Sequence, residues 1–212
     1  MGTISKGILG GFSGTVGTVI GGSWRGIEYM RSRPGRRTTA SSQKQKEQQA
    51  KFALMVKFQQ PFNDLLKYTF GSYAIRMTGP NSALSYNLRN AVAGTYPDYE
   101  VNYSMFLLSR GDLPNALNPA ATAGAAGEVN FAWTNNSGTG KAMATDTAMV
   151  VIHCPELNQS IYAVGEATRA DGELTMEVSN YSGKTVQTWI AFFSETGKDI
   201  ATSIYTGEVI VT

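Results

Sequence analysis

The C-terminal half of the chain has the hydrophobic pattern of a β-sandwich. Short segments rich in branched and aromatic residues are separated by turn-forming clusters of Asp, Asn, Ser and Gly. Several segments alternate, as in Val129, Phe131 and Trp133, and a sheet with one buried face requires this alternation. The predicted strands are 99–108, 128–133, 148–153, 160–164, 173–178, 185–193 and 204–211. We therefore predict an antiparallel Ig- or fibronectin-like β-sandwich over residues 98–212, with residues 115–127 as a linker.

The middle of the chain has a helical pattern instead. Good helix formers follow two serines that can cap a helix, and apolar residues recur at helical spacing until Pro61 interrupts them. A shorter stretch continues to Gly71. Residues 82–93 carry a third apolar stripe, with Gly94 as its stop. These patterns predict a short helical segment over residues 38–97.

The start of the chain predicts a β arm rather than a helix. Glycine is dense here, and each glycine inside a helix costs about 1 kcal/mol relative to alanine. Residues 15–20 are mostly β-branched, Gly21-Gly22 is a turn signal, and residues 23–31 alternate, so we expect a β-hairpin. The chain is thus predicted as an α+β protein with an N-terminal β-hairpin arm over residues 1–37.

Charge separates this arm from the rest of the chain. The net charge is only +2. The first 57 residues nevertheless carry ten Lys or Arg against two Glu, a balance of +8. The remaining 155 carry eight Lys or Arg against fourteen Asp or Glu, a balance of −6. This asymmetry predicts either a basic arm that meets a polyanion or two regions that attract each other, within one chain or between copies.

Candidate catalytic and metal chemistry finds little support in the sequence. One Cys and one His allow no intramolecular disulfide and supply too few ligands for a structural zinc site. They are neighbours, His153 and Cys154, so on a strand we expect one in the core and the other at the surface, not a catalytic pair. The Gly-Thr-Gly-Lys sequence at 138–141 lacks the spacing of a phosphate loop. We predict a non-enzymatic protein with no catalytic residue, metal, cofactor or small-molecule substrate.

The N-terminal uncharged run raises the question of a membrane or an export signal. Residues 7–24 are about long enough to span a bilayer, but they contain seven glycines and Arg25 ends the run. The first residues also lack the charge and leucine content of an export signal. We expect synthesis in the cytoplasm and no membrane insertion.

The basic and aromatic residues of the arm are the candidate contact residues. They are Trp24, Arg25, Tyr29, Arg31, Arg33, Arg36 and Arg37. Such residues can bind phosphates through counterion release and stack on bases, so a nucleic-acid-binding module is one hypothesis. They can equally dock on the acidic β region of a neighbouring copy. We favour docking, because the composition after Lys44 is that of an ordinary helix surface.

Several motifs resemble a known family. They are Lys6–Gly14, Ser23–Ile27 and Arg31–Pro34 near the start, and Thr168–Gly172 and Ser203–Gly207 near the end. They resemble an uncharacterised family of proteins of about this length from Bacteroidota and their phages, over the whole chain. The resemblance identifies no catalytic residues, and it implies a structural protein made without an export leader. We therefore expect self-assembly into a homo-oligomer through the arm, as a virion component or another multi-subunit shell or tube.

Overall fold

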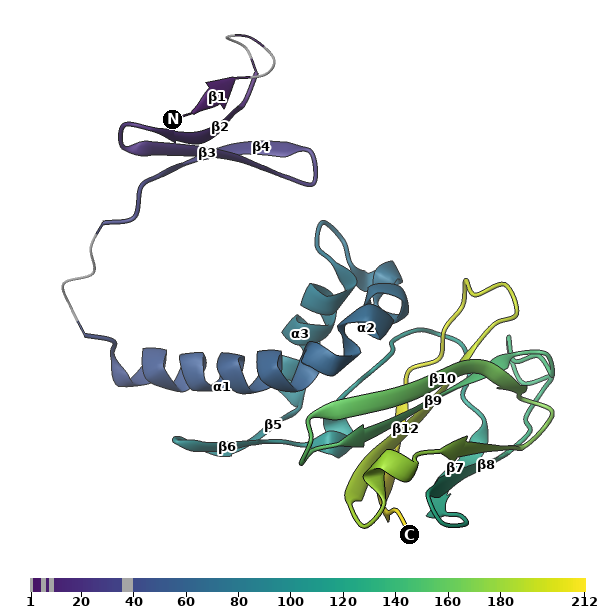
Figure 1. The fold of residues 1–212 in the computed structure, drawn as a ribbon. Helices are drawn as coiled ribbons and strands as arrows, with labels where there is room; N and C mark the ends of the chain where they lie inside the picture. The colour runs from purple at the N-terminus through teal and green to yellow at the C-terminus, as the bar shows by residue number, and fades with distance from the viewer. Residues whose placement is uncertain (1, 5–6, 8–9, 36–39) are drawn as a thin grey trace. The chain divides into compact units, whose positions relative to one another are not determined.

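The structure, a computed structural model, describes residues 2–4, 7, 10–35 and 40–212. The chain forms two compact units, Met1–Gln43 and Lys44–Thr212. Among the described residues before Gln43 the only regular elements are strands, and the second unit contains the helices and the remaining strands (Figure 1). The predicted α+β class, with a β arm and an antiparallel sandwich, is confirmed.

The N-terminal unit is a four-stranded antiparallel sheet with its strands in sequence order. The strands are β1 (Thr3–Ile4), β2 (Phe12–Val16), β3 (Val19–Trp24) and β4 (Ile27–Ser32). The turn between β3 and β4 consists of Arg25 and Gly26, both with positive φ, as a two-residue hairpin turn requires. The prediction of a turn at Gly21-Gly22 is wrong, because both glycines lie inside β3. A Cβ at Gly21 would overlap the Phe12 carbonyl oxygen, so this glycine allows a close approach of β2 rather than a turn.

Three α-helices open the second unit, as predicted. They are α1 (Gln43–Gln59), α2 (Asn63–Thr69) and α3 (Gly79–Asn90), with 3₁₀ turns η1 (Gln60–Phe62) and η2 (Gly71–Tyr73) between them. The third helix begins earlier than predicted, because the Thr78 hydroxyl accepts a hydrogen bond from the Asn81 N–H and Pro80 occupies the first turn. It also ends earlier than predicted, at Asn90, because a strand begins at Val92.

The remaining strands form two packed sheets and one hairpin. One sheet has the order β10-β9-β12-β13, the other β11-β8-β7, and β5 pairs with β6. Their bounds are β5 (Val92–Thr95), β6 (Asp98–Val101), β7 (Leu117–Ala123), β8 (Glu128–Thr134), β9 (Thr147–Cys154), β10 (Gln159–Thr168), β11 (Glu173–Glu177), β12 (Thr185–Phe193) and β13 (Ile204–Ile210).

Two strand predictions are wrong. The predicted strand 99–108 is mostly not a strand, because it leaves the short β6 for the 3₁₀ turn η3 (Tyr103–Met105). The predicted linker 115–127 contains β7, whose small residues pair with β8. Alanine and threonine carry little hydrophobic signal, so only the pairing with a neighbouring strand reveals this element.

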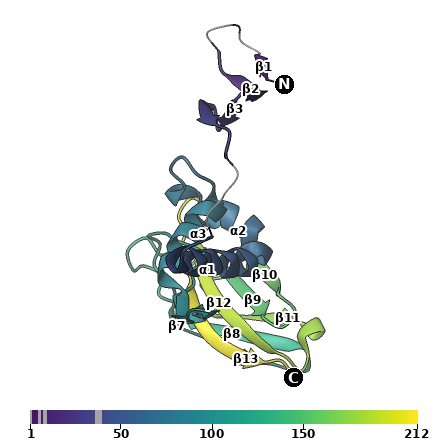
Figure 2. The same ribbon diagram turned by 90° about the vertical axis from the view of Figure 1, so that its left-hand side faces the viewer.

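The helices and both sheets share one core. The rings of Phe62 and Trp189 lie 6.4 Å apart between η1 and β12, and those of Trp133 and Phe192 lie 5.5 Å apart between the two sheets. Figure 2 shows α1 lying over the sheet that contains β9 and β12, with β8 and β11 beyond it. Strands β9 and β12 are therefore covered on both faces, and the helical segment is packed onto the sandwich.

Candidate interaction surface

Five of the seven predicted contact residues lie in or beside the N-terminal hairpin. Trp24 ends β3, Arg25 forms the turn, Tyr29 and Arg31 lie in β4, and Arg33 follows it. The Arg33 N–H donates a hydrogen bond of 2.7 Å to the Thr18 carbonyl, so strand pairing continues beyond the end of β4. The other two, Arg36 and Arg37, lie outside the described residues.

The pairing of β3 with β4 brings the aromatic residues to one face. Trp24 lies opposite Ile27, Gly22 opposite Tyr29, and Ile20 opposite Arg31. Directly opposed residues of an antiparallel pair share a face. We call the five side chains gathered here the Trp24 face; they are Ile20, Trp24, Ile27, Tyr29 and Arg31. Alternation along residues 23–31 predicts Ile27 and Tyr29 on one face and Trp24 on the other; the position of Trp24 is wrong, because the turn at Arg25 and Gly26 interrupts that alternation.

This face is open to solvent. Trp24 is 54% exposed, Ile27 58% and Tyr29 47%. The Tyr29 ring lies close over Gly22, since a Cβ added at that glycine would be 3.1 Å from the ring carbon that bears the hydroxyl. The tyrosine thus covers strand backbone, and its outer surface is available to a partner.

The opposite face is partly closed by the start of the chain. The Gly11 N–H donates a 2.6 Å hydrogen bond to Glu28 Oε2, and the Phe12 ring lies against Gly21. Even so, Gly21 is the only buried residue among those described in this unit. The sheet therefore has no apolar side chain that is fully removed from water.

A second charged surface lies on the β11-β8-β7 sheet. The strand pairing sets Glu173 opposite Ala132, Thr175 opposite Asn130, and Glu177 opposite Glu128. These residues point away from the core, because the alternate residues of β8 are buried. We call the outward set the acidic face; its members are Glu128, Asn130, Ala132, Glu173, Thr175 and Glu177. The sequence contains no Lys or Arg at 111–140 or 170–183.

Sequence reasoning missed the acidic face as a surface. The sequence analysis counted its carboxylates only in the net charge, because β8 and β11 are separated by more than thirty residues. At this face, Glu166, Asp171 and Glu173 line a cavity of about 580 Å³. Hydrogen bonds from the Thr168 N–H and hydroxyl lower the pKa of Asp171. This carboxylate therefore stays charged under mildly acidic conditions.

The His-Cys neighbours do not form a reactive pair. Their side chains point to opposite faces of β9, as predicted, but both are buried, so the expected surface position for one of them is wrong. The reason is that β9 has the helices on one face and the second sheet on the other. The His153 ring lies 4.9 Å from Phe58, and its Nδ1 lies 2.8 Å from Ser160 Oγ. Burial lowers the pKa of His153 to about 4.

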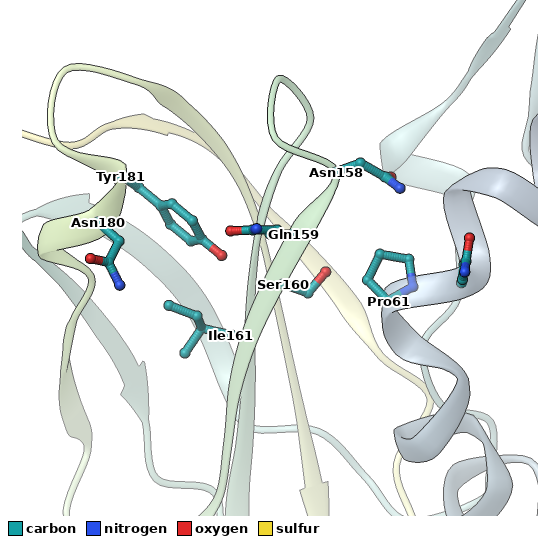
Figure 3. A pocket seen from close by; sticks show the side chains of 8 residues that line it. Pro61, Asn158, Gln159, Ser160, Ile161, Asn180 and Tyr181 are labelled. Carbon is teal, nitrogen blue, oxygen red and sulfur yellow. The ribbon is translucent and has the colours of Figure 1, made fainter.

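A polar cavity of about 540 Å³ lies between η1, β10 and the turn before β12. Figure 3 shows its amide and hydroxyl side chains; it is lined by Gln60, Pro61, Asn158, Gln159, Ser160, Ile161, Asn180 and Tyr181. Burial raises the pKa of Tyr181, which keeps its hydroxyl neutral. The lining thus offers hydrogen bonds, and its Ser160 hydroxyl lies against His153 Nδ1, whose lowered pKa makes the imidazole a weak base.

Among the described residues, no three His, Cys, Asp or Glu side chains gather closely enough to hold a metal ion. No helix formed by these residues is both long and apolar enough to cross a membrane.

Comparison with solved structures finds partial matches to fibronectin domains. The FN1–FN3 domains of chicken CNTN1 match with a TM-score of 0.37 and 12% identity, over 48% of this chain and 35% of that chain. The fn3 domain of the human collagen alpha-1(XX) chain matches with a TM-score of 0.36 and 8% identity, over 49% of this chain and 91% of that chain. No curated protein matches. Residues 11–207 match the family of unknown function DUF6266, and the chain belongs to that family.

Proposed function

We propose that this protein is a non-enzymatic structural protein that self-assembles through its N-terminal sheet. One observation carries the proposal: the sheet exposes Trp24, Ile27 and Tyr29 on one face and buries no large side chain among its described residues. A small sheet gains stability by packing a hydrophobic face against another element. A second copy of the chain supplies such an element.

The size of the exposed face supports this role. A buried aromatic side chain removes roughly 150–250 Å² from water, and apolar burial is worth about 25 cal/mol per Å². Trp and Tyr are also the residue types that dominate the energetics of protein interfaces. A homo-oligomer built on this face suits a virion component or another multi-subunit shell or tube. The Bacteroidota and phage origin implied by the sequence resemblance stays a prediction.

The non-enzymatic part of the proposal has its own support. His153 is the chain's one imidazole, and its buried position and lowered pKa remove it from general acid–base work near neutral pH.

A nucleic-acid-binding module is the second candidate. Arg31 lies in β4 and Arg33 just beyond its end, near exposed aromatic rings, and this arrangement suits phosphate contact and base stacking. Ile20 and Ile27 share the same face, however, and aliphatic side chains offer nothing to a phosphate backbone. The mixed aliphatic and aromatic character therefore favours a protein partner.

Light scattering coupled to size-exclusion chromatography tests the proposal. We expect the full chain to form a homo-oligomer, and Trp24→Ser with Tyr29→Ser to weaken self-association at least tenfold, as loss of interface aromatics does. Tyr68→Ser with Tyr162→Ser is the matched control, because these tyrosines are exposed in the second unit. A full chain that stays monomeric at high concentration contradicts the proposal. A monomer that elutes with nucleic acid supports the second candidate.

A further inference from the structure

We propose that the N-terminal sheet of one copy docks on the acidic face of a second copy. This inference rests on the proposed function and names the acceptor surface for it. A second copy is the occupant because the charges are complementary: residues 1–43 carry six Lys or Arg against one Glu, a balance of +5, and residues 44–212 carry twelve against fifteen Asp or Glu, a balance of −3.

The acidic face has an uncompensated charge pattern. Glu128 and Glu177 lie directly opposite each other on neighbouring strands. Like charges in this position destabilise a sheet, so a cation from outside would relieve the repulsion. Among the described residues, no Lys or Arg forms an ion pair with either glutamate or with Glu173, whereas Lys184 pairs with Glu156 elsewhere in the unit.

The order of charged and uncharged positions on the two surfaces corresponds. On β11, Glu173 and Glu177 are four residues apart, which is about 13 Å along a strand. Arg31 lies opposite Ile20 at one end of the Trp24 face, with Arg33 beyond it, and Arg25 lies at the turn beyond the other end. The Trp24 face, which is the donor surface, thus has basic residues at both ends and apolar residues between them. The acceptor surface reads acidic at both ends of β11, with shorter side chains between them.

The centre of the acceptor leaves room for the bulky side chains of the donor. Thr175 lies between the two glutamates of β11, Ala132 lies opposite Glu173, and Ala120 of β7 lies opposite Ala132. Small side chains keep the strands accessible to a large ring, and Trp24 and Tyr29 supply two. The one acidic residue on β4, Glu28, belongs to the other face of the N-terminal sheet, where it accepts the hydrogen bond from Gly11. The Trp24 face therefore presents no carboxylate from β3 or β4 that would repel the acidic face.

A charge-swap experiment tests this acceptor in the full chain. One variant carries Arg31→Glu and Arg33→Glu, and the other carries Glu173→Lys and Glu177→Lys. We expect each variant alone to self-associate at least tenfold more weakly than the unchanged protein, because donor and acceptor then repel each other. Mixed in equal amounts, the two variants should assemble again, since each donor then meets an acceptor of opposite charge. Light scattering measures all three samples, and recovery on mixing also shows that both variants are folded.

The matched control is Glu195→Lys with Glu208→Lys, which changes charge equally at exposed positions away from β11. If the acidic-face variant assembles as this control does while the arginine variant fails, the acceptor is wrong and self-assembly through the arm stands. Failure of the mixed variants to assemble, when the unchanged protein does, also overturns the acceptor. If the unchanged protein is a monomer, the proposed function itself fails.

Discussion

Arg169 shows how a single buried charge organises the sandwich. Its Nε donates to Asp146 Oδ2 at 3.1 Å, and its two terminal nitrogens donate to Asn136 Oδ1 and to the Pro114 carbonyl at 2.7 Å each. The guanidinium also lies 4.4 Å from the centre of the Phe192 ring. Burial lowers the pKa of Arg169, and the carboxylate beside it opposes that shift. The side chain remains charged and ties together segments from four places in the sequence.

Replacing this arginine tests that role. Arg169→Met leaves the Asp146 carboxylate buried without its cation, so we expect the free energy of unfolding to fall by about 3–5 kcal/mol. Urea denaturation measures the loss. Arg89→Met at an exposed helix position is the matched control, and we expect it to change stability by less than about 0.5 kcal/mol. Equal losses in the two variants would show that the buried pair adds nothing to stability.

His153 makes stability depend on pH. Its pKa is lowered from 6.5 to about 4 in the folded protein by burial, so the unfolded chain binds a proton first as the pH falls. The stability that this residue contributes is complete above pH 6.5 and is lost between pH 6.5 and about 4. We expect a loss of about 2 kcal/mol from pH 7 to pH 5, measured by urea denaturation. His153→Phe should flatten that slope, and an unchanged slope in this variant would assign it to other groups.

At the scale of elements, a seam joins residues 108–113 to residues 200–203. The Ser109 hydroxyl donates to the Ala201 carbonyl at 2.7 Å, and the Leu108 N–H donates to Ser203 Oγ at 2.8 Å. Gly111 lies so close to the other segment that an added Cβ would overlap the Ile200 carbonyl oxygen. The glycine is therefore required by the close approach of two segments that are distant in sequence.

The close approach at this seam predicts that adding one methyl group at Gly111 lowers stability. Gly111→Ala forces the two segments apart, and we expect a loss of about 1–3 kcal/mol in the free energy of unfolding, as overpacking produces. Gly71→Ala is the control, because its added Cβ would meet no atom within 4 Å. Thermal or urea denaturation of both variants gives the comparison. A Gly111 variant as stable as its control would mean that the seam relaxes without cost.

Elements with a strong periodic pattern were predictable from the sequence. Strands such as β8, β9 and β12 are long and apolar, and their positions agree closely with the prediction. Strand β7 was not predictable, because its Ala- and Thr-rich sequence becomes a strand only by pairing with β8. The turn of the N-terminal hairpin was misplaced for a related reason. Glycines that permit a close approach look the same in sequence as glycines that permit a turn.

At the scale of the whole molecule, the two compact units predict separate roles. The second unit contains the shared core of helices and sheets, so deleting residues 1–37 should leave a folded protein. We expect its free energy of unfolding to stay within about 1 kcal/mol of the full chain in dilute solution. Light scattering should report a monomer, because the Trp24 face is gone. If the truncated protein still forms the same oligomer, the arm is not the assembly element.

The local pattern of residues decided the fold class, the basic character of the arm and the residue types that the arm exposes, because periodicity, glycine density and charge are properties of neighbouring residues. Tertiary structure alone decided which side chains share the Trp24 face, that carboxylates from β8 and β11 form one acidic face, and that His153 is buried. Each depends on strand register or on what covers a strand. Those are contacts between segments distant in the chain, which no local pattern encodes.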